Sequence, residues 1–323
     1  MAPLRPEPHA GLRPGLRPDP RQGAVLIMTL LLLLAAVSMV FHFSSLTLRQ
    51  ATEARFLAAE YQADLLAESV LEIARTRLAD DDNLTYDSPD DKWSKRVQED
   101  NWTLRITPCN ALINANALLD DERMQTAVET LLRDKSHPLT LLDNLLDWVD
   151  DELSERNFGS ENLLYSRRWP PYRPRNADLE TPEELLLVHG WDAVPRNWLE
   201  SHFTAWSKDN VNINFVPEDI FKALLPELAN QWDVIDAWRR DKGFQSKADL
   251  QEAMPFLRDD LNLWNEVIAA VAVKSTYFQA VIEVRLPFVY EKRRYLLYRA
   301  PLLLSRAPQV IRGDVLAVRP TAD

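Results

Sequence analysis

The chain has 323 residues, 46% of them hydrophobic, and a formal net charge of −12 at pH 7. A polyanion of this size is a poor partner for phosphate backbones, which argues against nucleic acid as a ligand. Its single cysteine, Cys109, cannot form an internal disulfide, and we expect it to be a small buried hydrophobe.

An uncharged run over residues 24–41 follows a proline-rich polar arm that ends at Gly23. The run is long enough for about 27 Å of helix, roughly the hydrocarbon thickness of a bilayer. Three machineries could act on such a segment: signal peptidase, stop-transfer insertion, or the peptidase that trims pilin-like precursors. The first is disfavoured because no small-residue cleavage site follows. The arm carries four Arg against one Glu and one Asp, which predicts a cytoplasmic N-terminus and an exported remainder.

Behind the apolar run, a helical period continues as far as Asp80–Asn83, and no proline occurs between Gln22 and Pro89. Charged residues fall largely opposite the apolar positions, so we expect one amphipathic helix continuous with the membrane span. An ordinary anchor with a packed juxtamembrane helix would show the same pattern. The apolar positions are Ala54, Leu57, Ala58, Tyr61, Leu65, Val70, Ile73 and Leu78.

Two segments far apart in the chain alternate in the manner of half-buried strands. The first is residues 101–107, which end at Pro108, and the second is residues 278–286. We expect the charged EKRR at 291–294 to connect the second strand to a last strand at 295–298 in a hairpin. Helix-length apolar periods lie between them, at 120–134, 138–153, 181–190, 216–241 and 247–254. The pattern predicts an α+β fold, in which a long N-terminal helix packs on a small antiparallel sheet and a large all-α domain is inserted between the strands.

The predicted boundaries follow from these changes of pattern. Residues 1–23 form the cytoplasmic leader, and 24–110 hold the membrane helix, the stalk helix and the first strands. The inserted helical domain covers 111–273, and the last strands and tail cover 274–323.

Acidic residues crowd the segment 143–162 against the single cation Arg156. No EF-hand spacing with its glycine is present, so a solvated loop and a metal site both remain open. The acids are Asp143, Asp147, Asp150, Asp151, Glu152, Glu155 and Glu161.

Several motifs together resemble one known family. They are INANALL at 113–119, DWVDDELSERNFGSENLLY at 147–165, PPYRPRNADLETPEELLLVHG at 170–190, VNINFVPEDIFKAL at 211–224 and GFQSKADL at 243–250. With the glycine-led apolar helix, the chain resembles the K subunit of the type II secretion system, a minor pseudopilin also called general secretion pathway protein K, from about residue 21 to about residue 306. Phe215 stands where the family often has threonine.

The resemblance implies a mode of processing. Prepilin peptidase would cut between Gly23 and Ala24 and leave the apolar helix on the mature protein. Most pilin-like proteins have a glutamate as the fifth mature residue, but that position here is Met28. A subunit without this glutamate and with a bulky insertion suits the tip of a filament in the inner membrane, where it would initiate or cap the pseudopilus.

The resemblance also implies partners and a metal. The partners would be the other minor pseudopilins, of the I, J and H types, whose helices would pack beside Leu57, Tyr61 and Leu65. Calcium would bind at the positions of Asp150, Glu152, Glu161 and Asn162. Leu153 and the amide Asn162 replace acids common in the family, so one of two calcium positions is expected to be lost.

Other classes fit less well. The five histidines show no metal spacing, no nucleophile motif surrounds Cys109, and seven glycines form no phosphate-cradling loop, so we expect no enzyme. Residues 223–250 resemble a helix-hairpin-helix unit of the SAM-like kind, but the hairpin lacks the glycines that let backbone N–H groups approach a phosphate. A minor pilin of a type IV pilus and a membrane-anchored periplasmic binding protein remain alternatives, and the helical insertion favours type II secretion.

Overall fold

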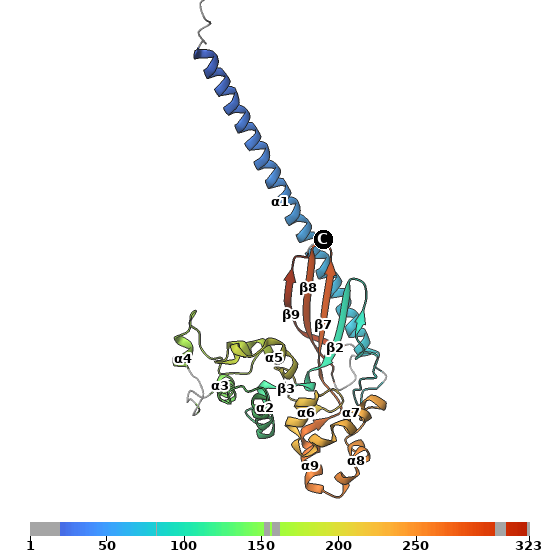
Figure 1. The fold of residues 1–323 in the computed structure, drawn as a ribbon. Helices are drawn as coiled ribbons and strands as arrows, with labels where there is room; N and C mark the ends of the chain where they lie inside the picture. The colour runs from blue at the N-terminus through green and yellow to red at the C-terminus, as the bar shows by residue number, and fades with distance from the viewer. Residues whose placement is uncertain (1–19, 82, 152–155, 157–161, 301–307, 322–323) are drawn as a thin grey trace, which may run out of the picture. The chain divides into compact units, whose positions relative to one another are not determined.

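The computed structural model describes residues 20–81, 83–151, 156, 162–300 and 308–321 (Figure 1). The chain divides into two compact units, Met1–Ala58 and Ala59–Asp323. One helix, α1 (Pro20–Ala79), contributes to both.

In the first unit, α1 contains the predicted apolar run. Its side chains are exposed from residue 24 to residue 44, and the stretch is long and apolar enough to cross a membrane, judged by length and composition. A single apolar N-terminal helix of this kind supports a membrane-anchored protein with one pass.

The second unit is built on a five-stranded antiparallel sheet in the order β1-β2-β7-β8-β9. Burial alternates along β7, whose Phe278, Ala280, Ile282 and Val284 lie on the face covered by α1. The strand bounds are β1 Val97–Gln98, β2 Trp102–Pro108, β7 Tyr277–Leu286, β8 Val289–Tyr298 and β9 Gln309–Arg319. The predicted α+β class, with a long helix on a small sheet, is confirmed.

The terminal hairpin exists, but its turn is not where we expected it. Pro287 and Phe288 connect β7 to β8, and Phe288 takes a positive φ of 73°. The charged EKRR lies inside β8, where Arg293 pairs with Asp64 and Glu291 and Arg294 pairs with Glu183 at 2.7 Å. Charges with partners on other elements can occupy a strand interior, which the sequence pattern alone did not reveal.

The face of α1 that packs on the sheet also differs from the predicted stripe. Only Val70 and Leu78 of that stripe are buried, and four of the seven buried positions on α1 are alanines. Alanine lets the helix backbone approach the sheet closely, while Tyr61 and Leu65 of the stripe are exposed. The buried positions are Ala59, Ala63, Ala67, Val70, Leu71, Ala74 and Leu78.

The segment between β2 and β7 is mainly helical, with two short parallel strand pairs that we did not expect. β3 (Ile113–Asn114) pairs with β4 (Phe203–Thr204), and β5 (Val211–Asn212) pairs with β6 (Val271–Ala272). The α-helices are α2 Glu122–Asp134, α3 Thr140–Val149, α4 Asn162–Ser166, α5 Arg196–His202, α6 Glu218–Leu224, α7 Trp232–Asp241, α8 Asp249–Ala253 and α9 Leu261–Ala270. The 3-10 turns are η1 Cys109–Ala111, η2 Ala115–Ala117, η3 Pro182–Leu187, η4 Trp191–Ala193, η5 Pro226–Gln231 and η6 Pro255–Arg258.

A proline explains why one predicted helix is divided. Pro226 separates α6 from α7 within 216–241, and in place of the predicted helix over 181–190 the chain forms a 3-10 turn, Pro182–Leu187. A proline removes an N–H donor and clashes with the preceding turn, so an α-helix seldom continues through it.

The two N-x-N motifs form the same arrangement of hydrogen bonds. Asn114 accepts a hydrogen bond from the Asn116 N–H, and Asn212 accepts one from the Asn214 N–H. The second asparagine of each pair then bonds a distant backbone: Asn116 accepts from Leu179 N–H and donates to its carbonyl, and Asn214 does the same with Phe244. All four asparagines are buried, so these motifs hold loops together.

Candidate functional site

The predicted processing position lies in the first turns of the described chain. Gly23 and Ala24 are both within α1, and Ala24 and Met28 are exposed. The structure contains no peptidase, so the cut between them stays a prediction.

The predicted partner surface consists of exposed side chains. Leu57 in the first unit is 62% exposed, and Tyr61 and Leu65 in the second unit are 64% and 52% exposed. They recur every four residues and therefore share one side of α1. Because the sheet is covered by the alanine side of the same helix, these three large side chains are unpartnered within the described chain.

The acidic segment is organised by its single cation. Arg156 Nη1 lies 2.8 Å from Asp147 Oδ1 and also pairs with Asp150 Oδ2, and its backbone N–H points at the Asp147 carboxylate. Burial lowers the pKa of Arg156, but its bonds to Asp150 and Asp147 outweigh that effect and raise the pKa above its ordinary value. Burial and the nearby Asp147 raise the pKa of Asp143.

Of the four predicted calcium ligands, Asp150 is the one whose side chain lies within the described part of the structure. Asp150 is 8% exposed at the C-terminal end of α3, and its Oδ1 is buried without a hydrogen-bond partner among the described residues. Asn162 begins α4, while Glu152 and Glu161 lie outside the described residues. A buried carboxylate oxygen without a donor suits a hard cation, so Asp150 fits the predicted role. The fully buried Asp147 beside it was not predicted as part of this group.

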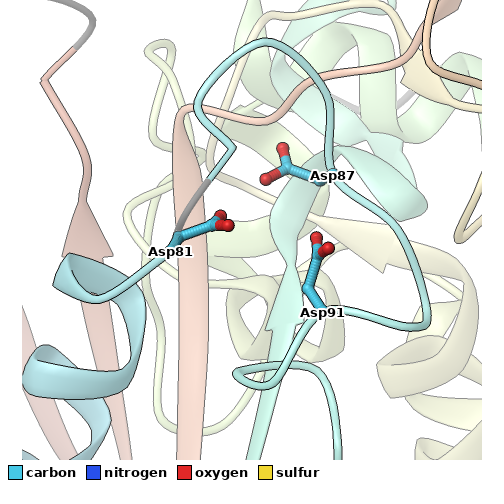
Figure 2. Close-up of side chains that lie close together, drawn as sticks. All are labelled: Asp81, Asp87 and Asp91. Atoms are coloured by element: carbon cyan, nitrogen blue, oxygen red, sulfur yellow. The ribbon is translucent and has the colours of Figure 1, made fainter.

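A second acidic group, which the sequence analysis missed, lies where α1 ends. Figure 2 shows the carboxylates of Asp81, Asp87 and Asp91 turned toward one another, and one oxygen from each lies within 4.8 Å of the others. The sequence marked Asp80–Asn83 only as a helix break. No spacing signal connects these residues, because their convergence depends on the loop that follows α1.

Arg299 neutralises part of this group. Its Nη1 lies 2.9 Å from Asp81 Oδ2, its Nη2 pairs with Asp87 Oδ1, and the Trp93 indole N–H donates to Asp81 at 3.1 Å. Burial raises the pKa of Asp87, and this effect is larger than the lowering caused by the ion pair with Arg299. Desolvation also raises the pKa of Asp91, to about 6, against the hydrogen bond from the Ser88 N–H.

The group ties together five parts of the second unit. Asp81 follows α1, Asp87 and Asp91 lie in the next loop, and Arg299 follows β8. Asp87 also accepts from the Ser275 N–H between β6 and β7, and its carbonyl accepts from Asn214. These hydrogen bonds and ion pairs show that the carboxylates act as a structural cross-link between the segments.

Comparison with known proteins shows that part of this chain is similar to one family. Residues 109–208 match the family model described as "Type II secretion system (T2SS), protein K". A Type II secretion system protein K from Aeromonas hydrophila is 28% identical over 148 residues, covering 43% of this chain and 44% of that protein. One from Klebsiella pneumoniae is 27% identical over 183 residues, covering 47% of this chain and 56% of that protein. The chain spans about half the length of the curated relatives it matches.

A solved structure shows the same fold. The GspK-GspI-GspJ complex from the enterotoxigenic Escherichia coli Type 2 Secretion System contains a chain that matches with a TM-score of 0.67 at 19% identity. The match covers 81% of this chain and 99% of that chain, so it includes most of the described fold.

Proposed function

We propose that this chain is a member of the type II secretion system protein K family and acts as a non-catalytic minor pseudopilin that initiates or caps a pseudopilus at its tip. The other minor pseudopilins, of the I, J and H types, are its partners, and the assembly drives export of folded proteins from the periplasm. The chain crosses the inner membrane once, with its N-terminus in the cytoplasm and its folded part in the periplasm.

One observation supports this proposal above the others. The same helix that has a membrane-length apolar run also presents Leu57, Tyr61 and Leu65 to solvent, while its alanines cover the sheet. Large apolar side chains in a row on a helix are typical of helix-to-helix contacts. A plain membrane anchor would have no need of them beyond the apolar run. The four arginines of the leader support the cytoplasmic orientation.

The processing step tests whether the chain is handled as a pseudopilin. Full-length chain expressed with prepilin peptidase and purified from membranes should begin at Ala24 and keep its apolar helix, because the enzyme cuts after a glycine. Intact-mass measurement gives the N-terminus directly. An N-terminus at Met1, or one beyond residue 41, would show that a different machinery inserts the chain.

Calcium binding is a separate part of the proposal. We propose that Asp150, Glu152, Glu161 and Asn162 hold one calcium ion beside α3. The buried, donor-free Oδ1 of Asp150 supports this assignment, since a carboxylate oxygen in that state is costly without a cation or a donor. The ion would supply charge neutralisation to an acidic segment that otherwise has only Arg156.

Adding calcium should therefore stabilise the insertion. An ion present at a hundred times its dissociation constant contributes about 2.7 kcal/mol, which is a rise of several degrees in Tm for a domain of this size. Magnesium should have a smaller effect, because it gives up water reluctantly. The measurement is thermal unfolding in EDTA, calcium and magnesium. Asp150→Asn and Glu161→Ala should abolish the calcium shift, whereas the exposed Asp192→Asn should keep it. Equal midpoints in all three conditions for the unaltered chain would contradict the metal site.

A further inference from the structure

Trp169 is the most exposed large apolar side chain in the part of the chain that the structure describes, at 94% exposed. It lies in the segment that follows α4, between Arg168 and Pro170. An indole contributes about 150–250 Å² when it is covered, so leaving one in water forgoes a large stabilisation. Neither membrane insertion through α1 nor the proposed contacts of Tyr61 and Leu65 use this residue.

The loop that presents Trp169 is held firmly on both sides. Tyr165 before it is fully buried against Trp148, with ring centroids 5.1 Å apart, and Tyr172 after it contacts the Tyr165 ring at 5.3 Å. The Tyr172 hydroxyl donates to the Leu187 carbonyl at 2.7 Å. The indole therefore extends from a loop whose two ends share one aromatic cluster.

Arg168 adds a further restraint directly next to Trp169. Its Nη1 donates to the Tyr172 hydroxyl at 3.0 Å, and its Nη2 lies 2.8 Å from His189 Nδ1. Two consecutive prolines follow the tryptophan and limit its backbone further. These contacts restrain the backbone that carries the indole, so binding at Trp169 costs little backbone conformational entropy, which is a property of interface anchors.

The charges around Trp169 point to the kind of partner. Arg167 and Arg173 are exposed, and neither guanidinium pairs with an acid among the described residues. By contrast, Arg168 lies 3.8 Å from Asp192, and Arg175 pairs with Glu180 and Glu184. In a chain with a net charge of −12, two exposed, unpaired arginines lie within four positions of an exposed indole, so this segment is locally cationic.

We propose that Arg167, Trp169 and Arg173, called here the Trp169 surface, dock an acidic segment of a partner protein that carries an aromatic or aliphatic side chain. The apolar side chain of the partner packs on the indole, and its carboxylates accept hydrogen bonds from the two guanidinium groups. Tryptophan and arginine are the residue types most often found as interface anchors, which agrees with this composition.

A protein segment fits this surface better than an anionic membrane does. A bilayer with anionic lipids would be repelled by the excess negative charge of the chain, which is −12 overall. A narrow peptide can engage the two arginines and leave most of the chain uncontacted. The surface does not involve α1, so the inference holds whether or not the chain joins a pseudopilus.

Three short peptides test the proposal on the full chain in nanodiscs. The chain is labelled with 5-fluorotryptophan, and the Trp169 signal in the ¹⁹F spectrum is assigned with Trp169→Phe. The peptide EDLFDE should shift that signal saturably, whereas EDGGDE, which lacks the apolar pair, and KRLFRK, which reverses the charge, should bind at least tenfold more weakly. In the Arg167→Gln/Arg173→Gln variant the affinity for EDLFDE should fall at least tenfold, while the exposed Arg258→Gln should leave it unchanged.

Several results would overturn the proposal. They are no saturable shift with EDLFDE, equal affinity for EDLFDE and KRLFRK, or an unchanged affinity in the double arginine variant. Vesicles of phosphatidylglycerol that shift the Trp169 signal when EDLFDE does not would assign the surface to a membrane. Both arginines are exposed, so unchanged near-ultraviolet CD of the double variant establishes that any lost binding is not lost folding.

Discussion

Replacing Arg299 by methionine is expected to lower the free energy of unfolding of the second unit by about 3–5 kcal/mol, because it leaves buried carboxylates without their counter-charge. Asp87 is fully buried, and Asp81 and Arg299 are nearly so. Methionine can fill the space of the arginine stem, so the loss comes mainly from removing the guanidinium, whose Cζ lies 4.5 Å from the Phe278 ring centroid. Urea unfolding of the chain that begins at residue 46 measures the change.

Two further variants identify the cause of the Arg299→Met effect. Arg285→Met removes an arginine whose side chain is 72% exposed and whose nearest acid, Glu283, is 3.9 Å away, so it should cost less than about 1 kcal/mol. Adding Asp87→Asn to Arg299→Met should recover part of the loss, because the buried charge is then removed with its partner. An Arg299→Met chain as stable as the unaltered one would show that water, and not Arg299, compensates these carboxylates.

Leu57→Glu or Leu65→Glu is expected to abolish association with the I- and J-type minor pseudopilins. A glutamate on this side of α1 would have to give up water in an apolar helix-to-helix contact, which costs more than such an interface commonly supplies per residue. Both leucines are more than half exposed in the structure, so the fold should be unaffected and the far-ultraviolet CD unchanged. Size-exclusion chromatography of the mixed proteins measures the loss.

Gln62→Glu is the matched control for the leucine variants. It introduces the same carboxylate one residue beyond Tyr61, which places it about 100° around the helix. The control should assemble normally. Equal loss of assembly in Gln62→Glu would mean that added charge anywhere on α1 prevents association, and intact complexes with Leu57→Glu and Leu65→Glu would remove this side of the helix from the interface.

Local periodicity was enough to predict the main elements of the fold. The end of α1 at Ala79, the strand ending at Pro108 and the alternation in β7 all follow from patterns within one segment. The first half of β8 and all of β9 were less visible. The first half of β8 has the buried charged residues Glu291 and Arg294 where alternation leads one to expect apolar residues, and β9 has exposed valines because it is an edge strand.

What could not be predicted depends on contacts between distant segments. The predicted apolar stripe on α1 did not identify the side of the helix that packs on the sheet, because that side uses small residues such as Ala63 and Ala67. The pairing of Arg299 with Asp81 and Asp87 spans more than 200 positions and leaves no local signal. For the acidic segment, the sequence identified Asp150 but not the neighbouring role of Asp147, which depends on where Arg156 folds back.

The most direct measurement is the mass of the assembly formed by the unaltered proteins. The chain lacking residues 1–45 should be monomeric alone, and on mixing with the periplasmic parts of its I- and J-type partners it should elute as one species whose light-scattering mass is the sum of all three. Separate elution of this chain from both partners, at micromolar concentrations and with each protein folded, would contradict its assignment as the K-type subunit of a pseudopilus tip.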